Sequence, residues 1–174
     1  MMSNDILKGK RILAVDDEQD VLDILREILD VCDVETASTF ATAGELLMQK
    51  DYDAVLLDIM GVRGFDLLQI AAEKGIPALM LTAHGLNPDN LVGSIELGAK
   101  AYIPKERMQE IDVYLRALFL DRKEGLEHSR SWFDRLSSFF DERFGDGWKN
   151  DHKKFWEEFD NTYRTSKKEV ERLL

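Results

Sequence analysis

Five polar residues have side chains that suit metal binding and phosphoryl chemistry, and each stands at the end of a short apolar run. They are Asp16, Asp17, Asp58, Thr82 and Lys105. Three carboxylates in one pocket would repel each other and raise each other's pKa, and a bound cation would relieve that repulsion. A site built only from oxygen atoms suits Mg²⁺. These residues therefore predict a magnesium site if the fold brings them together.

The same set contains the groups that phosphoryl transfer needs. A carboxylate can act as a nucleophile and form an aspartyl phosphate. Lys105 is a point charge that can hold a phosphoryl group or a carboxylate, and the Thr82 hydroxyl can donate a hydrogen bond to a phosphoryl oxygen. A cation, the lysine and the hydroxyl together would neutralise the equatorial oxygens of the transferred group. His84, two residues after Thr82, would modulate water access at the pocket mouth or be a solvated loop residue.

Taken one at a time, these residues have simpler explanations. Asp16 and Asp17 could cap a helix at its positive end. Thr82 could cap the end of a strand, and Tyr102 could be a half-buried strand residue. The order and spacing of the whole set therefore carry more weight than any single residue.

Alternating strands and helices must position these residues. The apolar runs predict strands, and the stretches between them have apolar residues at helical spacing. The predicted strands are residues 12–15, 33–37, 54–57, 77–81 and 101–103. This alternation predicts an α/β fold, a doubly wound parallel sheet with helices on both faces. Ligands bind such sheets beyond the carboxyl ends of the strands, so the polar residues should meet at one edge. The second strand contributes none of them, as expected of an edge strand.

Four motifs resemble those of a known family. They are Val15-Asp16-Asp17-Glu18, Leu56-Leu57-Asp58, Leu81-Thr82-Ala83 and Ala101-Tyr102-Ile103-Pro104-Lys105. In this order, each at a predicted strand end, they resemble the receiver domain of two-component response regulators over about residues 8–120. The resemblance implies a flavodoxin-like sheet of five strands in the order 2-1-3-4-5.

The resemblance also implies an acceptor and a metal site. Asp58 would accept a phosphoryl group from a histidine kinase or a phosphotransfer protein. Mg²⁺ would be held by Asp16, Asp17 and Asp58, with the backbone carbonyl of Met60 completing the protein ligands. Lys105 would contact the phosphoryl group. Beyond phosphorylating and dephosphorylating itself, such a protein is not expected to be an enzyme.

A switch pair is implied as well. Thr82 would move toward the phosphoryl group, and Tyr102 would then turn inward into the space that is freed. The surface around the fourth helix, fifth strand and fifth helix would therefore respond to phosphorylation.

The loop after Asp58 departs from the usual pattern of the family. Its glycines stand three and six residues after the aspartate, at Gly61 and Gly64, and the loop is about two residues shorter than usual. The position of the Met60 carbonyl and the start of the next helix are expected to change with it.

Composition divides the chain of 174 residues into a receiver part, 1–120, and a helical extension, 121–174. The net charge is −11, of which residues 1–120 carry −10 and residues 121–174 carry −1. All three tryptophans and ten of the sixteen aromatic residues lie after residue 120. An acidic chain with no basic face is a poor candidate for binding DNA.

Several classes of protein are excluded by the same composition. A single cysteine, Cys32, excludes a disulfide framework and a cysteine zinc cluster. No run approaches the roughly 18 apolar residues of a membrane helix, and residues 1–10 show no apolar signal segment. A cytoplasmic protein without membrane insertion is therefore expected.

The extension predicts a helical hairpin. Aromatic and apolar residues keep helical spacing on both sides of Gly145-Asp146-Gly147. About 50 residues cannot easily bury this many large aromatics alone, so the hairpin should pack on the receiver part, on a second copy or on a partner. The favoured prediction is a homodimer, with a heptad seam formed by Trp156, Phe159, Tyr163, Ser166, Val170 and Leu173.

Three functions remain open. The favoured one is a phosphorylation-switched interaction protein whose helical tail dimerises or docks an output partner. The second is a transcription regulator with a short, divergent DNA-binding tail. The third is a phosphate sink in a phosphorelay, with a tail that is merely structural.

Overall fold

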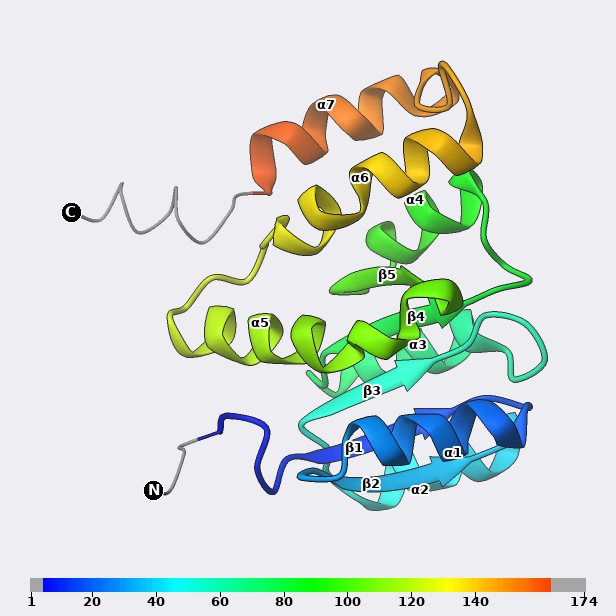
Figure 1. The fold of residues 1–174 in the computed structure, drawn as a ribbon, viewed down its shortest axis with the longest axis vertical. Helices are drawn as coiled ribbons and strands as arrows, with labels where there is room; N and C mark the ends of the chain where they lie inside the picture. The colour runs from blue at the N-terminus through cyan, green and yellow to red at the C-terminus, as the bar shows by residue number, and fades with distance from the viewer. Residues whose placement is uncertain (1–4, 164–174) are drawn as a thin grey trace.

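The computed structural model describes residues 5–163, and its centre is one parallel sheet (Figure 1). The strands are β1 (Arg11–Val15), β2 (Asp33–Ala37), β3 (Ala54–Leu57), β4 (Ala78–Thr82) and β5 (Ala101–Pro104). Their order is β2-β1-β3-β4-β5. This confirms the doubly wound, flavodoxin-like sheet and places the second strand at an edge. Every residue of β3, β4 and β5 is buried, which explains their continuous apolar character.

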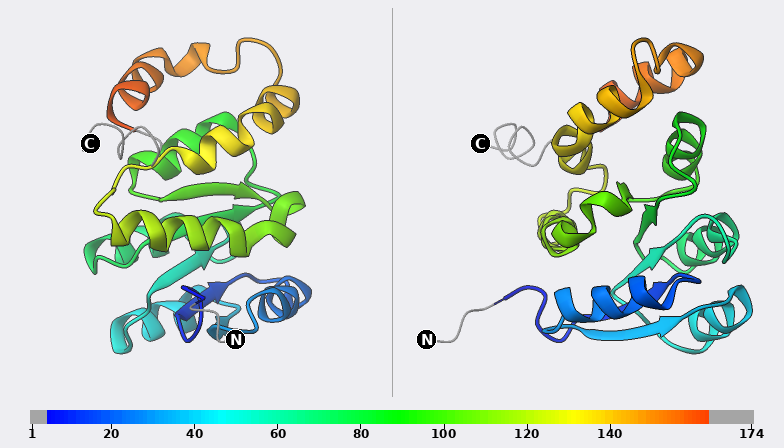
Figure 2. Two further views of the ribbon diagram at one scale, coloured as in Figure 1. Left: turned by 60° about the vertical axis from the view of Figure 1, so that its left-hand side comes forward. Right: turned by 45° about the vertical axis from the view of Figure 1, so that its right-hand side comes forward.

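Helices cover both faces of the sheet (Figure 2). They are α1 (Gln19–Ile28), α2 (Phe40–Gln49), α3 (Gly64–Glu73), α4 (Pro88–Glu96) and α5 (Ile111–Lys123). α1 packs against α5 on one face, and α2 packs against α3 on the other. A 3₁₀ segment, η1 (Lys105–Glu110), lies between β5 and α5. None of the helices in residues 5–163 is long and apolar enough to cross a membrane.

The extension forms the expected helical hairpin. α6 (Ser131–Phe144) and α7 (Lys153–Thr162) are joined by residues 145–149 and the short segment η2 (Asn150–His152), and residues 124–130 connect α5 to α6. Figure 1 shows the hairpin lying against α4 and β5, with α6 on the inside. α6 contacts β5 and α5. Of the three arrangements that the sequence left open, the structure therefore has the hairpin packed on its own receiver part.

This packing corrects the predicted dimer seam. Trp156 and Phe159 are only 5% and 2% exposed within a single chain, and both rings contact the Phe133 ring of α6. They are core residues and are not available to a second copy. Tyr163 is half-buried, and Ser166, Val170 and Leu173 lie outside the described residues. The homodimer itself stays a prediction.

Candidate functional site

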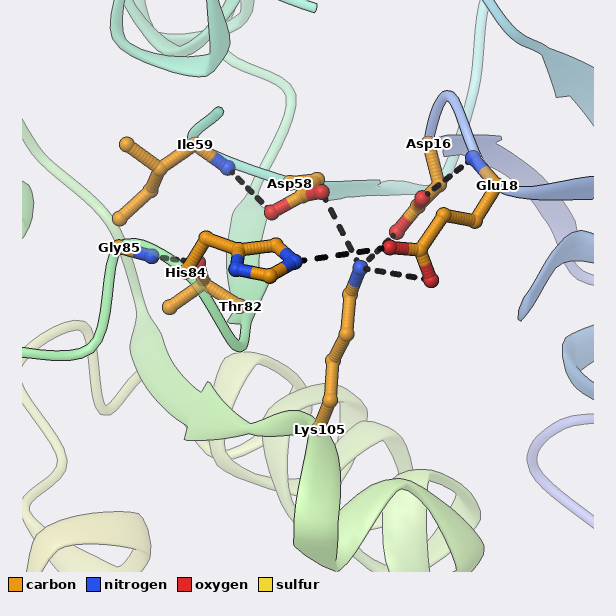
Figure 3. A network of polar contacts seen from close by, with 8 residues as sticks. All are labelled: Asp16, Glu18, Asp58, Ile59, Thr82, His84, Gly85 and Lys105. Carbon is orange, nitrogen blue, oxygen red and sulfur yellow. Dashed lines mark hydrogen bonds and ion pairs between the residues drawn. The ribbon is translucent and has the colours of Figure 1, made fainter. Parts of the chain in front are cut away.

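The predicted polar residues meet at the carboxyl ends of the strands (Figure 3). Asp16 follows β1, Asp58 follows β3, Thr82 ends β4 and Lys105 follows β5. Asp16 and Asp58 are 2% and 3% exposed, and Thr82 is fully buried. Asp17 is exposed. Asp16, Asp17 and Asp58 each offer a carboxylate oxygen within 4.8 Å of the others.

Lys105 lies between the buried carboxylates. Its Nζ is 2.8 Å from Oδ2 of Asp16 and 3.1 Å from Oδ2 of Asp58. Burial alone would lower the pKa of Lys105, but the bond to Asp16 and the charges of Asp58 and Asp16 outweigh it and raise that pKa. Burial raises the pKa of Asp16, although Lys105 opposes that shift. The ammonium group is therefore charged at neutral pH and holds the two carboxylates together.

The site has more carboxylate groups than ammonium groups, and this imbalance favours a bound cation. One ammonium group faces the three carboxylates of Asp16, Asp17 and Asp58, all within one small volume. The acidic cluster offers only oxygen atoms, the donors that Mg²⁺ prefers. These residues fit a magnesium ion, which would supply positive charge next to a transferred phosphoryl group. Met60 lies two residues after Asp58 with an exposed side chain, and the role of its carbonyl stays a prediction.

Backbone amides hold the two buried carboxylates in place. The N–H of Ile59 donates to Oδ1 of Asp58 at 2.8 Å. The N–H of Glu18, at the start of α1, donates to Oδ1 of Asp16 at 2.9 Å. In each case the other carboxylate oxygen faces Lys105. The carboxylates are thus oriented before any ligand binds.

Two further residues border the opening of the site. His84 is exposed, and its Nε2 is 3.8 Å from Oε1 of Glu18. The other oxygen of Glu18 is 3.9 Å from Nζ of Lys105. His84 is therefore an exposed loop residue beside Glu18, and a role in water access stays a prediction. Sequence reasoning assigned no role to Glu18, although it directly follows the two aspartates.

Thr82 and Tyr102 are linked by one residue, Gly85, that sequence reasoning missed. The Gly85 N–H donates to Oγ1 of Thr82 at 3.0 Å, and the Tyr102 hydroxyl donates to the Gly85 carbonyl at 2.6 Å. That hydroxyl also accepts from the Asn87 N–H at 3.1 Å. Nothing but the spacing of three residues from Thr82 could have pointed to Gly85.

Tyr102 lies in the inward orientation that the predicted switch requires. Its side chain is fully buried, and its ring contacts the Phe140 ring of α6 with centroids 6.1 Å apart. A change of this orientation on phosphorylation stays a prediction. Burial raises the pKa of the Tyr102 hydroxyl, so the hydroxyl keeps its proton and acts as a donor. With Tyr102 in this orientation, α6 of the hairpin packs against its ring.

The short loop after Asp58 closes through close backbone contacts. Gly61 has a φ of 87°, and a Cβ there would lie 2.3 Å from Oδ2 of Asp17. A Cβ at Gly64 would lie 2.0 Å from the carbonyl oxygen of Asp58. Arg63 has left-handed backbone geometry, with φ and ψ of 54°, and its guanidinium packs 4.1 Å from the centre of the Phe40 ring. The loop therefore brings the start of α3 directly against the candidate acceptor.

Replacing Gly64 by Ala should disrupt this loop. The new methyl group would collide with the backbone of Asp58, and we expect a loss of about 2 kcal/mol or more in the free energy of unfolding, since overpacking typically costs 1–3 kcal/mol. Urea denaturation measures this loss. Gly44→Ala is the matched control, because Gly44 lies in α2 with open space around it and should gain up to about 1 kcal/mol in helix propensity. Equal stability of the two variants would contradict the proposed contact.

Comparisons with known proteins agree with this geometry. The family model described as the response regulator receiver domain matches residues 12–116. Over 111 residues the chain is 36% identical to the two-component response regulator ARR10 of Arabidopsis thaliana, covering 59% of this chain and 20% of that protein. Over 100 residues it is 36% identical to the transcriptional regulatory protein CpxR homolog of Haemophilus influenzae, covering 55% of this chain and 43% of that protein.

Solved structures of receiver domains are also similar to this chain. A CheY-like response regulator receiver domain protein from Methanospirillum hungatei has a TM-score of 0.62 and 26% identity, covering 68% of this chain and 99% of that one. The chain spans less than half the length of the curated relatives reported above. The family match runs from β1 into α5 and ends before α6.

Proposed function

Since this chain belongs to the response regulator receiver domain family of two-component systems, we propose that Asp58 accepts a phosphoryl group from a histidine kinase or a phosphotransfer protein. The observation that carries this proposal is the contact of Lys105 with both Asp16 and Asp58 beside a third carboxylate. Asp58 is the only one of the three carboxylates that follows the central strand β3. It is buried and held by a backbone amide.

The proposed reaction uses each residue in a distinct way. The Asp58 oxygen that faces Lys105 attacks phosphorus, while the bond between phosphorus and the donor's histidine nitrogen breaks and its electron pair stays on that nitrogen. Lys105 offers positive charge to the transferred group, and the Thr82 hydroxyl donates to one of its oxygens. Asp16 and Asp17, with Asp58, would hold Mg²⁺. The chain needs no other catalytic activity, and we propose that it is a phosphoacceptor that does not act on a separate substrate.

Metal dependence tests this proposal. With a small phosphodonor such as acetyl phosphate and Mg²⁺, the protein should gain one phosphoryl group, measured by intact mass spectrometry. Excess chelator should abolish the gain, because Asp16, Asp17 and Asp58 would then face the incoming anionic group with one ammonium group alone. Undiminished labelling in chelator would contradict the metal site. No labelling under either condition would contradict the proposed function.

We further propose that the output is a protein interaction and not a DNA contact. The Haemophilus influenzae relative is named as a transcriptional regulatory protein, but the matched region covers under half of it. The hairpin that follows the receiver part here carries a net charge of only −1 over residues 121–174, which gives a polyanion little to bind. A DNA shift that weakens with salt would favour the transcription regulator instead, and rapid phosphate loss without any change in partners would favour a phosphate sink.

A further inference from the structure

The hairpin and the receiver part form a cavity of about 280 Å³ at the end of the molecule away from Asp58. Its wall includes the end of α4, residues 98–101, one side of α5 and parts of residues 126–132. Figure 1 shows the connection between α5 and α6 on the side where β3 begins, whereas Asp58 follows the end of β3. The cavity therefore lies at the opposite edge of the sheet, and none of its described lining residues belongs to the candidate site.

The cavity has the size and the lining for one aromatic ring. The apolar side chains of its wall include those of Leu79, Ile95, Ala99, Leu118, Leu126 and Trp132. An apolar cavity of about 150 Å³ can hold benzene, so this one has room for a ring with a short side chain. Aromatic rings pack well edge to face, and the His128 and Tyr163 rings at the cavity form such a pair, with centroids 5.2 Å apart.

Two positive groups lie at the cavity without a carboxylate partner. Lys100 is half-buried, and its Nζ donates a long hydrogen bond of 3.5 Å to the carbonyl of Glu127. Burial and the charge of Arg122 lower the pKa of Lys100, although the charge of Glu127 opposes that shift. Neither Lys100 nor Arg122 forms an ion pair with a carboxylate in the described part of the chain. A negative group in the cavity would therefore stabilise both cations.

The wall also contains carboxylates, and they limit the charge that a ligand can carry. Glu96, Asp121 and Glu127 border the cavity. Like charges in one site repel each other, so a phosphate monoester with two negative charges would be repelled more strongly than a carboxylate. The lining therefore fits a ligand with a single negative charge.

One buried hydroxyl at the cavity has unused hydrogen-bonding capacity. Tyr114 is 3% exposed and lines the cavity, and its hydroxyl has no hydrogen-bond partner among residues 5–163. Burial raises the pKa of this hydroxyl, so it keeps its proton and can donate. Buried polar groups are usually hydrogen-bonded, and a ligand oxygen would offer an acceptor.

We propose that this cavity binds a small aromatic monocarboxylate, with its ring against Trp132 and its carboxylate at Lys100 and Arg122. The apolar wall accepts the ring, and the two cations accept the charge. Lys100 directly precedes β5, whereas Trp132 lies in α6, so the ligand contacts both the receiver part and the hairpin. The proposal does not depend on phosphorylation of Asp58.

Binding of 4-fluorophenylacetate to the full chain tests this proposal. Fluorine NMR of the probe measures its dissociation constant, which we expect at about 1 mM or below for a ligand of about 11 non-hydrogen atoms. The uncharged 4-fluorophenylacetamide has the same ring and should bind about 10- to 100-fold more weakly, because hydrogen bonds to charged groups are the stronger ones. No binding of the carboxylate at about 10 mM, or equal affinity for the amide, would overturn the proposal.

Lys100→Met tests the position of the charge. Methionine is unbranched and apolar, so it should fill the same space, while the affinity for the carboxylate should fall about 10- to 100-fold and that for the amide should stay the same. Lys50→Met is the matched control, because it removes an equal charge from a residue that pairs with Glu35 and does not line the cavity; it should bind the carboxylate like the wild-type protein. Unchanged affinity of Lys100→Met for the carboxylate would overturn the assigned position.

Ala117→Phe tests the space itself. Ala117 is half-buried and lines the cavity from α5, so a phenylalanine ring there would occupy the volume assigned to the ligand, and neither probe should bind at about 10 mM. Ala41→Phe is the matched control at an exposed position of α2 and should bind like the wild-type protein. Urea denaturation shows that each variant is folded. Undiminished binding to folded Ala117→Phe would place the ligand elsewhere and overturn the cavity as its site.

Discussion

Asp58→Asn is expected to abolish labelling by a phosphodonor. The amide has almost the shape of the carboxylate, so the fold should be kept, but its oxygen is a poor nucleophile and cannot form the acyl phosphate. Intact mass spectrometry after incubation with acetyl phosphate and Mg²⁺ should show no added phosphoryl group. Every other carboxylate of the chain remains present in this variant, so the loss would assign the acceptor to one residue.

The control for this variant is another aspartate with an exposed side chain. Asp66 lies in the first turn of α3, where it pairs with Arg63 on the surface, so Asp66→Asn should label like the wild-type protein. Full labelling of Asp58→Asn would show that the nucleophile is a different residue. Loss of labelling in both variants would show that labelling depends on the fold as a whole. Circular dichroism of each variant shows whether the fold has been lost.

Lys105→Met should cost several kcal/mol of stability in the absence of Mg²⁺. The lysine side chain is 9% exposed and bridges carboxylates that are themselves 2% and 3% exposed. Removing one partner of a buried ion pair typically costs about 3–5 kcal/mol, because the remaining charges stay buried without compensation. Urea denaturation in the presence of a chelator measures this loss.

Mg²⁺ should then restore much of the lost stability, because a divalent cation bound by the same carboxylates replaces the missing positive charge. The matched control is Lys50→Met, which removes an ion pair with Glu35 at a partly exposed position. That change should cost less than about 1 kcal/mol and should not respond to Mg²⁺. A loss in Lys105→Met that Mg²⁺ leaves unchanged would contradict a metal site at these carboxylates.

The sheet and the meeting of the polar residues at its edge could be predicted, because both depend on local patterns of apolar and polar residues in the sequence. The apolar run 54–57 has the length and composition of a buried strand, and Asp58 ends it. A parallel sheet brings the carboxyl ends of its strands to one edge, so the strand ends were enough to place Asp16, Asp58 and Lys105 at that edge. The strand order came from the resemblance to the receiver family. None of this required knowledge of side-chain packing.

The position of the hairpin could not be predicted from the sequence, and the reason is physical. Its aromatic content showed that it must be buried, but burial is not directional, so a receiver face and a second copy could cover the aromatic residues of the hairpin equally well. The choice depends on contacts between residues far apart in the sequence, such as Phe140 with Tyr102 and Arg143 with Glu106. The contact of Tyr102 with Phe140 could not be predicted either, since it depends on the position of the hairpin.

The short connection between α5 and α6, residues 124–130, determines how hard the hairpin is to displace. A short flexible connection holds its two ends at an effective concentration on the order of 1 mM. A face that binds the hairpin with a dissociation constant of only about 10 µM would therefore be covered roughly 99% of the time. A separate protein present at about 1 µM would have to bind that face roughly a thousandfold more tightly than the hairpin does to compete equally. Inserting glycine and serine into residues 124–130 would weaken this advantage gradually, because the effective concentration falls as the connection lengthens.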